Sequence, residues 1–482
     1  VVEPLFVMAL TWAVGGLVNL GSRHKFDAFL RKLLKEKGSK ASLPSSGTVF
    51  DVTFDVESLS WKPWLSTVPA YSVDSKVDFK ADYSSIIVPT SASVCYTTLL
   101  RTLLRGDKHT LVVGPTGTAK SVTVQQFFAQ GLDSTFEPIA MAFSAQTSAN
   151  QTQDILDAKF EKRRQGQDKD SGLAYTMWGP MLGKRFLLFI DDFNMPKRET
   201  YGAQPPVELM RQLVDHDGWY DRKTLRFRKI VDVTLVGAMG PPGGGRQPMT
   251  NRMLRHMHMI SFVDMSEETI SGVFTTIVGA FLQSMSKDLQ PLTTPIVAAT
   301  IAMYATTCEV LRPTPAKPHY TFNLRDVSKV IQGVLMADKR RVTTKEQLVK
   351  LWTHECARVF ADRLINDDDR NWFLAETKKV VKDKFSMSYE SAVPSGEQLL
   401  YCNFYTAGAD PPIYEEVADM SKLSELLAEH QKDYNEQHIP MDLVLFGDAL
   451  AHICRISRVL SQPSGNALLL GVGGSGRQSL AR

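Results

Sequence analysis

Cysteine is scarce in this sequence, and its placement excludes two kinds of small, cross-linked domain. The 482 residues contain five cysteines, none of them in a C-x-x-C pair: Cys95, Cys308, Cys356, Cys402 and Cys454. An odd number of scattered thiols fits neither a disulfide framework nor a zinc site built from cysteine pairs. We therefore expect the protein to occupy a reducing compartment.

The sequence also lacks an excess of charge of either sign. Its formal net charge is +3, with 22% charged and 43% hydrophobic residues. Polyanion-binding surfaces and disordered tails show a much stronger bias. The composition predicts an ordinary folded protein of several domains and gives no indication of nucleic-acid binding.

No stretch has the features of a secretion signal or a membrane span. The most apolar stretch, residues 1–20, lacks a basic n-region, starts without Met and contains Glu3 and a Gly15-Gly16 pair. We expect a buried helix there. Nothing else approaches the roughly 20 apolar residues that cross a bilayer, so we expect no membrane partner.

Two segments begin like metal-binding motifs but lack a required residue. HECAR starts at His354 like the zinc helix H-E-x-x-H, but its fifth residue is Arg358. The run from Asp367 imitates a calcium loop, but Trp372 stands where the turn requires Gly. Neither segment predicts a metal site.

The strongest positive signal is TLVVGPTGTAKS, residues 110–121. An apolar run leads into a loop that fits the phosphate-binding pattern G-x-x-x-x-G-K-S/T, except that Ala119 replaces the second Gly. We expect the loop to bind phosphate through Gly114, Pro115, Thr116, Gly117, Thr118, Ala119, Lys120 and Ser121. Lys120 would contact the β- and γ-phosphates and Ser121 would ligate Mg²⁺. The methyl group of Ala119 is tolerable if φ stays negative, and the alternative is a strand, turn and helix that bind no ligand.

The second signal is RFLLFIDDFNMP, in which an apolar run over 186–190 ends in two aspartates. Such a run predicts a buried parallel strand, and ligands of open α/β sheets bind at the carboxyl ends of the strands. We expect Asp191 to hold Mg²⁺ through water. Related ATPases usually have Glu at the next position to orient the attacking water, and Asp192 is one methylene shorter.

The rest of the chain supplies a recognisable framework around these motifs. Helices are expected over 1–40 and a short hairpin over 47–69. Five strands predict a three-layer α/β nucleotide-binding domain: the apolar run from 110 that ends at Gly114, residues 138–144, residues 186–190, a fourth within 231–246 that ends in a Pro/Gly loop, and residues 256–263. A helix is expected over 147–166, with the charge run Lys159 to Arg164 as its solvated face. From 267 to 373 the pattern is nearly all helical, interrupted by a proline-rich stretch that serves as a stiff connector or an SH3 ligand.

Two features follow the proline-rich stretch. Asn323 caps a predicted helix together with Asp326, and Arg325 in its first turn opposes the helix dipole, which suggests that it reaches an anion. Near the end, an apolar strand and a glycine-rich loop repeat the first motif, which predicts tandem nucleotide-binding units. The expected contacts of this second loop are Gly471, Gly473, Gly474, Ser475, Gly476, Arg477, Gln478 and Ser479, with Arg477 in place of Lys and Gln478 in place of the Mg²⁺ ligand.

Taken together, four stretches resemble the dynein heavy chain family, and the resemblance covers essentially the whole chain: GPTGTAKS, FIDDFNMP with YGAQPPVELMRQLVDHDGWYDR, PHYTFNLRDVSKVIQG, and GVGGSGRQSL. FIDDFNMP followed by YGAQPP is more similar to ciliary, axonemal dyneins than to the cytoplasmic transport form. The resemblance implies a ring of six AAA+ modules that uses ATP to move toward microtubule minus ends, with intermediate and light chains as partners and the axoneme of the cilium or flagellum as its location. The first module would carry the main hydrolysis, and the third would hold a regulatory ATP or ADP with Mg²⁺.

The same resemblance divides the chain into parts of consecutive modules. Residues 1–71 are expected to end the second AAA+ module. Residues 72–265 would form the large α/β subdomain of the third module and 266–373 its small helical subdomain. Residues 374–482 would begin the fourth module, cut after its phosphate loop, so that the sequence is a segment of a longer polypeptide.

Residue roles are implied in the same way. Arg325 matches the sensor-two arginine, and Arg255 matches an arginine finger that acts in trans on the neighbouring module. Arg252 competes for the finger role, and a surface ion pair is the alternative for Arg255. Val88 and Pro89 are expected to contact the nucleotide. Ala119, Asp192 and Gly240, where a polar first-sensor residue is usual, depart from the family pattern and weaken the case for hydrolysis more than the case for binding.

Three functions compete. The first is a regulatory part of an ATP-driven motor, and the second is a structural ring module that holds nucleotide permanently. A metabolic kinase is the third, but it predicts one loop and a lid where this chain has tandem modules.

Overall fold

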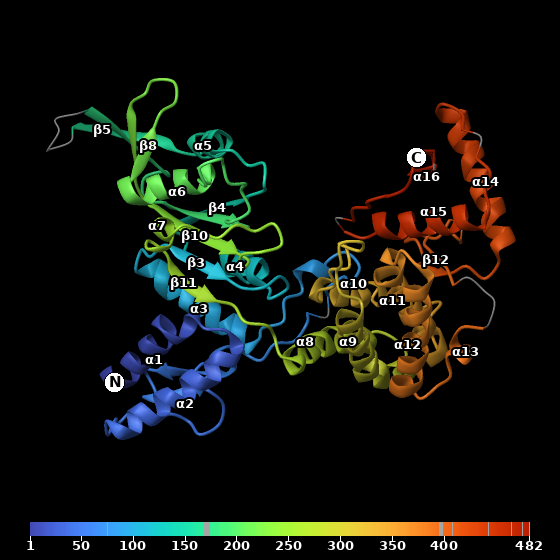
Figure 1. Cartoon of the computed structure of the whole chain (residues 1–482). Helices are drawn as coiled ribbons and strands as arrows, with labels where there is room; N and C mark the ends of the chain where they lie inside the picture. The colour runs from blue at the N-terminus through green and yellow to red at the C-terminus, as the bar shows by residue number, and fades with distance from the viewer. Residues whose placement is uncertain are drawn as a thin grey trace. The chain divides into compact units, whose positions relative to one another are not determined.

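The computed structural model describes residues 1–74, 76–167, 174–394, 399–406, 408–441, 443–463, 465–474 and 476–481. The chain forms two compact units (Figure 1). The first, called here the α/β unit, combines Val1–Ala70 with Pro89–Met265. The second, called the helical unit, combines Tyr71–Val88 with Ser266–Arg482.

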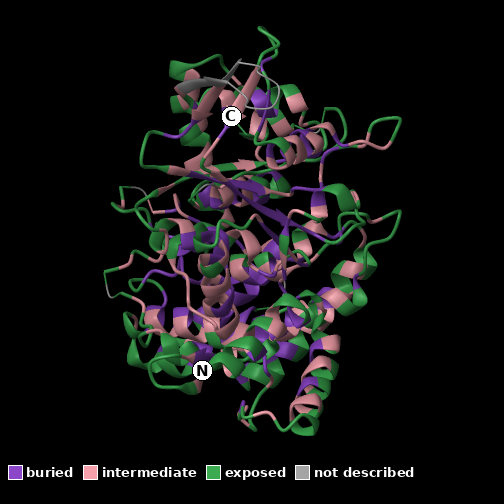
Figure 2. Ribbon diagram, turned by 90° about the vertical axis from the view of Figure 1, so that its left-hand side faces the viewer, coloured by how far each residue is buried: buried purple, intermediate pink, exposed green. Residues whose placement is uncertain are grey.

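A five-stranded parallel sheet forms the centre of the α/β unit. Its order is β11 (His258–Ser261), β3 (Thr110–Val113), β10 (Val233–Met239), β7 (Arg185–Asp191) and β4 (Phe136–Ala142). The residues Phe186 to Ile190 of β7 are each at most 4% exposed, as expected for a parallel strand covered on both faces. Figure 2 shows buried residues along the central strands of the sheet, and β3, β7 and β10 are the buried ones. The five predicted strands are confirmed.

Helices cover both faces of the sheet and complete three layers. On one face, α3 (Ser91–Arg105) and α4 (Lys120–Gln130) pack apolar side chains against β3, β7 and β10. On the other, α5 (Ala149–Asp157), α6 (Pro205–His216) and α7 (Asn251–Leu254) do the same. The predicted three-layer α/β domain is therefore confirmed.

A second sheet replaces part of a predicted helix. Its order is β5 (Glu161–Gln167), β6 (Ala174–Gly179), β9 (Phe227–Ile230) and β8 (Gly218–Tyr220). The helix expected over 147–166 covers only Ala149–Asp157, so the interpretation of Lys159 to Arg164 as a helix face is wrong: Glu161 onward belongs to a strand. The physical reason is tertiary, because β5 pairs with β6, which pairs in turn with β9 about 50 residues further along the chain.

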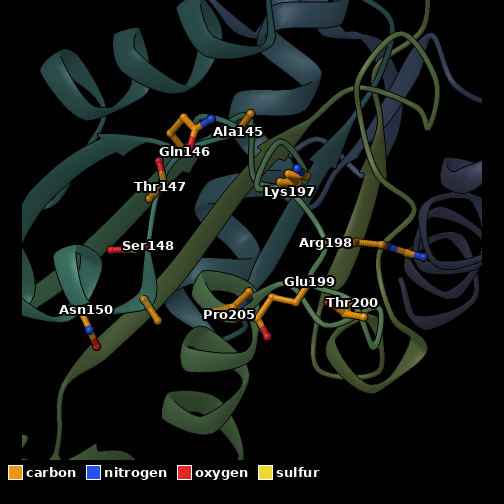
Figure 3. Close-up of a pocket in the computed structure, with 11 residues that line it drawn as sticks. Ala145, Gln146, Thr147, Ser148, Asn150, Lys197, Arg198, Glu199, Thr200 and Pro205 are labelled. Carbon is orange, nitrogen blue, oxygen red and sulfur yellow. The ribbon is translucent and has the colours of Figure 1, made fainter.

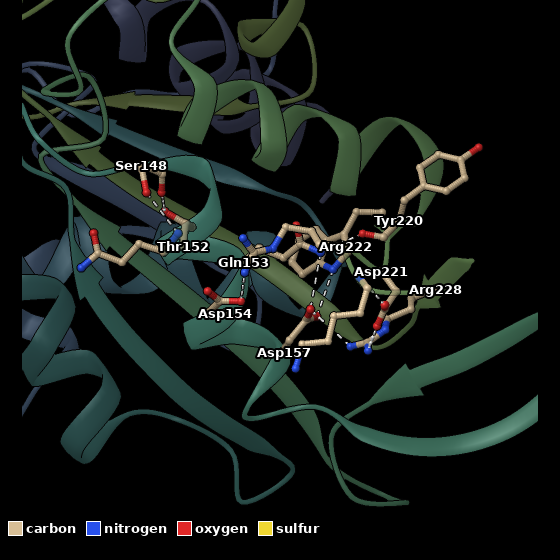
Figure 4. Close-up of polar contacts among 12 residues, drawn as sticks. Ser148, Thr152, Gln153, Asp154, Asp157, Tyr220, Asp221, Arg222 and Arg228 are labelled. Atoms are coloured by element: carbon tan, nitrogen blue, oxygen red, sulfur yellow. Dashed lines mark hydrogen bonds and ion pairs between the residues drawn. The ribbon is translucent and has the colours of Figure 1, made fainter. Parts of the chain in front are cut away.

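Polar contacts fix α5 to the β8–β9 hairpin (Figure 4). Asp157 accepts a hydrogen bond from Trp219 Nε1 at 3.0 Å and forms an ion pair with Arg228 at 3.2 Å. Arg228 also pairs with Asp221, and Gln153 Nε2 donates to the carbonyl oxygen of Tyr220 at 2.8 Å. These contacts hold the second sheet against the helix that precedes it.

The N-terminal segment confirms the predicted helices and hairpin but not the predicted burial. It contains α1 (Val2–Ala13), η1 (Gly15–Leu17), α2 (Leu20–Glu36) and the antiparallel pair β1 (Val52–Asp55) and β2 (Ser60–Pro63), followed by η2 (Trp64–Thr67). Only Val7 and Thr11 of α1 are buried, and Phe6 is 64% exposed, because one face alone contacts the rest of the unit. Among the described residues, no helix is long and apolar enough to cross a membrane.

The helical unit is built on one large core. Its elements are η3 (Tyr83–Ser85), α8 (Glu267–Gln283), η4 (Lys287–Leu292), α9 (Thr293–Val310), α10 (Leu324–Val334), α11 (Lys345–Val359), η5 (Ala361–Arg363), α12 (Asp367–Phe385) and α13 (Tyr389–Ala392). Asn323 and Asp326 form the predicted capping box of α10. The boundary predicted at Phe373 falls inside α12, and the core continues to Tyr401 and Tyr414.

A second, smaller core lies in the C-terminal part of the described chain. It packs β12 (Tyr401–Cys402) and β13 (Glu415–Glu416) with α14 (Met420–Gln437) and α15 (Gly447–Leu460), and α16 (Arg477–Ala481) follows the second glycine-rich loop. Leu443 and Phe446 lie before the first residue of α15.

A buried ionic cluster connects α11 to α15 within the helical unit. Glu355 is fully buried and accepts hydrogen bonds from Arg458 Nε at 2.9 Å and from Tyr414 Oη at 2.7 Å. Burial alone would raise the pKa of the Glu355 carboxyl, but the Arg458 guanidinium holds it below its usual value. Burial lowers the pKa of His354 to about 4, so the neighbouring imidazole stays neutral at pH 7. The rejected zinc motif HECAR therefore supplies a buried charge to the core.

Replacing Arg458 should destabilise the helical unit strongly. Arg458→Leu leaves the Glu355 carboxylate buried without a counter-charge, and we expect a loss of about 3–5 kcal/mol in the free energy of unfolding, measured by urea denaturation. Glu355→Leu combined with Arg458→Leu should recover most of that loss. Arg370→Ala is the control, because its pair with Asp367 is exposed and worth under about 1 kcal/mol. Equal stability of Arg458→Leu and this control would contradict the interpretation.

Candidate nucleotide site

The phosphate loop joins the end of β3 to the start of α4. Gly114 donates its backbone N–H to the carbonyl oxygen of Met239 at 3.2 Å, which extends the strand pairing into the loop. A Cβ atom at this position would lie 2.4 Å from the carbonyl oxygen of Phe262, so only glycine fits between β10 and β11. The close approach of the neighbouring strand therefore fixes the start of the loop.

Lys120 lies across the loop that it terminates. Its Nζ donates to the carbonyl oxygens of Gly114 at 2.7 Å and Pro115 at 2.6 Å. Thr118 Oγ1 donates to the Pro115 carbonyl oxygen at 2.9 Å, which tightens the turn. The ammonium group thus lies over the concave side of the loop, where a phosphate would place its negative charge.

Ser121 and Asp191 come together from positions 70 residues apart. Ser121 Oγ donates to Asp191 Oδ2 at 2.6 Å, and Asp191 Oδ1 accepts the backbone N–H of Asp192 at 3.0 Å. A hydroxyl and a carboxylate are the hard oxygen ligands that Mg²⁺ prefers. The two residues predicted as metal ligands therefore fit a shared Mg²⁺ site.

The backbone of Ala119 contradicts one expectation. The sequence argument required a negative φ, and Ala119 has φ +56° and ψ +24°, the left-handed region. The loop must reverse direction before α4 begins, and the second glycine of the usual pattern would do this without steric cost. Ala119 instead carries a cost of roughly 1–2 kcal/mol.

Asp192 lies beside a residue that the sequence argument overlooked. Its backbone is also left-handed, with φ +50°, and its Oδ1 lies 3.7 Å from a terminal nitrogen of Arg246. Gly240 follows the last residue of β10 and has no side chain to offer a first-sensor contact. The run PPGGGR was read from the sequence only as the loop that ends a strand, although an arginine after three glycines was a usable signal.

Two predicted nucleotide contacts belong to the helical unit. Val88 packs against the large core of that unit, whereas Pro89 begins the second segment of the α/β unit. Arg325 lies in the first turn of α10, with an exposed side chain. Their roles stay predictions.

Arg255 forms an ion pair within its own unit. A terminal nitrogen lies 2.7 Å from Asp215 Oδ1, Arg211 pairs with the other oxygen of this carboxylate, and Arg255 Nε donates to His256 Nε2 at 3.0 Å. The Arg255 guanidinium, and then Arg211, lower the pKa of Asp215 to about 2. The Arg255 side chain is still 60% exposed, and the finger role stays a prediction.

The second glycine-rich loop lacks the predicted strand before it. Residues 466–470 form no strand, and Leu468 and Leu470 are 84% and 82% exposed. A strand needs a neighbour to satisfy its backbone groups, and none pairs with this segment in the described part of the chain. Arg477 donates to the carbonyl oxygen of Val472 at 3.3 Å, and Ser475 lies outside the described residues.

A separate polar cavity of about 750 Å³ lies at the carboxyl ends of β4 and β7 (Figure 3). Its walls come from the segment after β4, including Gln146 and Thr147, and from the segment after β7, including Lys197 and Glu199. None of the residues predicted for nucleotide binding lines it. Since β7 separates β4 from β10 and β3 in the sheet, the cavity is distinct from the phosphate loop.

The sheet order, the loop after β3, the acidic pair after β7 and the helical unit that follows define a AAA+ P-loop module. Comparison with known proteins gives the family. Models described as "P-loop containing dynein motor region" and "P-loop containing dynein motor region D4" match residues 75–265 and 441–482. Models for a dynein heavy chain AAA lid domain and a dynein heavy chain ATPase lid domain match 1–66 and 277–370.

Full-length relatives agree with these matches. The chain is 42% identical to Dynein axonemal heavy chain 1 of Mus musculus over 511 residues and 39% identical to Dynein axonemal heavy chain 12 of Homo sapiens over 511 residues. It is 37% identical over 485 residues to the Dynein-1-beta heavy chain, flagellar inner arm I1 complex, of Chlamydomonas reinhardtii. Each alignment covers 100% of this chain and, in that order, 12%, 16% and 10% of the relative. The chain belongs to the axonemal dynein heavy chain family and corresponds to part of its motor region.

Ala119→Gly should stabilise the α/β unit. Glycine removes the left-handed cost of roughly 1–2 kcal/mol but makes the unfolded chain more flexible by about 0.4–1 kcal/mol. We expect a net gain of about 0.5–1 kcal/mol in chemical denaturation. Ala129→Gly is the matched control, because Ala129 is exposed within α4, the helix that follows Ala119, and glycine there should cost up to about 1 kcal/mol. A loss of stability in both variants would show that the loop is unstrained.

Proposed function

We propose that this chain is the regulatory nucleotide-binding part of an ATP-driven, minus-end-directed microtubule motor that powers ciliary or flagellar beating. The observation that carries the proposal is the 2.6 Å hydrogen bond between Ser121 and Asp191, which brings the phosphate loop and the acidic strand end into one site. The match of residues 75–265 to a P-loop containing dynein motor region supports nucleotide binding at this loop.

Each residue of the loop has a defined task in this proposal. Backbone N–H groups of residues 114–119 bind phosphate oxygens, and Lys120 exchanges its carbonyl partners for the β- and γ-phosphates. Ser121 ligates Mg²⁺ directly, and Asp191 holds it through water. Bound ATP with Mg²⁺ supplies the phosphoanhydride bond and the metal charge.

Hydrolysis at this site is proposed to be slow or absent. Asp192 is one methylene shorter than the usual glutamate, and misplacement of a catalytic group by about 1 Å can cost roughly 10²-fold in rate. Gly240 supplies no polar side chain. A site that binds nucleotide and turns it over slowly suits a regulatory module. A module that holds nucleotide permanently for structural reasons is the second candidate, favoured by the same two residues.

The remaining parts of the proposal come from the family. Partners are the other AAA+ modules of the same polypeptide, microtubules through parts outside this segment, and dynein intermediate and light chains, at the axoneme. Arg325 is proposed to contact nucleotide as sensor two, and Arg255 to leave its pair with Asp215 for the neighbouring module's nucleotide. Residues 471–479 are proposed to bind nucleotide without normal metal chemistry, because Gln478 lacks the hydroxyl ligand.

Lys120→Ala should abolish nucleotide binding at the first loop. The variant loses a charge-assisted contact to phosphate, so we expect the affinity for fluorescent ATP with Mg²⁺ to fall by at least about 10- to 100-fold. Lys108→Ala is the control, because this exposed lysine precedes the same strand at its opposite end. Unchanged affinity in Lys120→Ala would refute the assignment of the loop.

Asp192→Glu should raise single-turnover hydrolysis by roughly 10²-fold, because the longer side chain restores the position of the water-orienting oxygens. The measurement is conversion of bound ATP to ADP under conditions of excess protein. Asp192→Asn serves as the control and should stay at or below the wild-type rate. A fast wild-type site that Asp192→Glu leaves unchanged would count against slow hydrolysis.

A further inference from the structure

The segment between β10 and α7 folds back, so that Arg246 lies beside the end of β10. After Met239, the chain runs through Gly240 and two prolines into three glycines with φ of +120°, +57° and +88°. Gly243 and Arg246 exchange both backbone hydrogen bonds, at 3.0 and 3.1 Å. Two central residues with positive φ make a tight hairpin that only glycine adopts readily. The three glycines therefore place Arg246 back beside Gly240.

Gly240 and Arg246 fit one another. A Cβ atom at Gly240 would lie 2.6 Å from Arg246 Nε, 2.7 Å from its Cδ and 3.0 Å from its Cζ. The guanidinium group thus fills the space that a side chain at position 240 would need. The missing polar side chain and the glycine-rich hairpin are two parts of one arrangement.

The position of this guanidinium follows from the sheet order. Strand β10 lies between β3, which ends in the phosphate loop, and β7, which ends in Asp191. The end of β10 therefore lies between the two halves of the candidate site. A terminal nitrogen of Arg246 is 3.7 Å from Asp192 Oδ1, and its Nε is buried without a hydrogen-bond partner among the described residues. A buried donor without an acceptor is costly, which favours a role that uses its charge.

We propose that Arg246 senses the terminal phosphate of ATP at this site, in place of the side chain that Gly240 lacks. The inference rests on the proposed nucleotide binding. A guanidinium stays charged at all physiological pH values and offers planar donors that match phosphate oxygens. With no terminal phosphate present, Asp192 is the anion that holds it. A triphosphate competes with Asp192 for the same guanidinium, so occupancy by ATP changes the environment of the water-orienting carboxylate.

The test is a comparison of affinities that does not depend on hydrolysis. The full chain is titrated with ADP and with the non-hydrolysable triphosphate AMPPNP, each with Mg²⁺, by calorimetry. Binding that persists in Lys120→Ala measures the second loop and is subtracted. Arg246→Ala should weaken AMPPNP binding by about 10- to 100-fold, the range for hydrogen bonds to charged groups, and change ADP binding less than about threefold. Arg246→Lys should retain an intermediate preference for the triphosphate.

Gly240→Ala separates a phosphate role from simple packing. Its methyl group displaces the guanidinium, so it should reproduce the selective loss of AMPPNP affinity while Arg246 is still present. Combining it with Arg246→Ala should add nothing. Arg105→Ala is the matched control, because Arg105 lies at the same 3.7 Å from a carboxylate, Asp133, but on the surface, with 65% of its side chain exposed.

The outcomes distinguish this inference from the proposed function. Binding of both nucleotides by the wild type, with equal losses for ADP and AMPPNP in Arg246→Ala, would reduce Arg246 to a packing residue and leave the proposed function intact. Binding of neither nucleotide by the wild type would overturn both. A selective loss in Arg246→Ala and Gly240→Ala, absent in Arg105→Ala, supports phosphate sensing.

Discussion

The register of three parallel strands is the constraint on which the candidate site depends. Val236 in β10 pairs with Thr110 in β3 and with Phe189 in β7, so the three strands end at the same edge of the sheet. The hydrogen bond from Ser121 to Asp191 exists because of this alignment. A slip in register would turn side chains to the opposite face of the sheet and separate the loop from the acidic pair. The buried apolar faces of β7 fix that register and so position the polar atoms at its end.

The residues that depart from the usual pattern of such sites are concentrated where the backbone is least relaxed. Ala119 and Asp192 both have left-handed φ values, one at each half of the site. Such strain persists only where the surrounding structure determines it, here two strand ends and the start of a helix. The absence of a side chain at Gly240 removes the first-sensor contact, but it also leaves the space that the Arg246 guanidinium fills. These departures are therefore better understood together than as separate defects of an ATPase site.

In the helical unit, a buried ion pair holds together two helices that are distant in the sequence. Glu355 from α11 and Arg458 from α15 form an ion pair that both burial and hydrogen bonding determine. Gly333 in α10 lies against the same carboxylate, since a Cβ there would overlap Glu355. A hydrophobic replacement of both partners can be as stable, whereas removal of one partner leaves the other charge buried without a counter-charge. The pair connects α11, which lies within the residues 277–370 that match the lid domain, to α15, the helix that precedes the second glycine-rich loop.

The local sequence determined most of the secondary-structure elements and the phosphate-loop motif, because these depend on residues that are close together along the chain. Apolar runs predicted the five strands, and the run before Asp191 predicted a fully buried one. Asn323 and Asp326 predicted the capping box of α10. Motif spacing gave the family through the phosphate loop and the acidic pair. Tertiary structure decided the rest. The charge run after α5 became a strand because its pairing partner lies in a separate segment, and the segment before the second loop formed none because no strand pairs with it among the described residues. The positive φ of Ala119 and the pairing of Arg255 with Asp215 depend on contacts between segments that are distant in the sequence. The three glycines before Arg246 are a local signal, but the position of its guanidinium between the two halves of the site follows from the order of the strands.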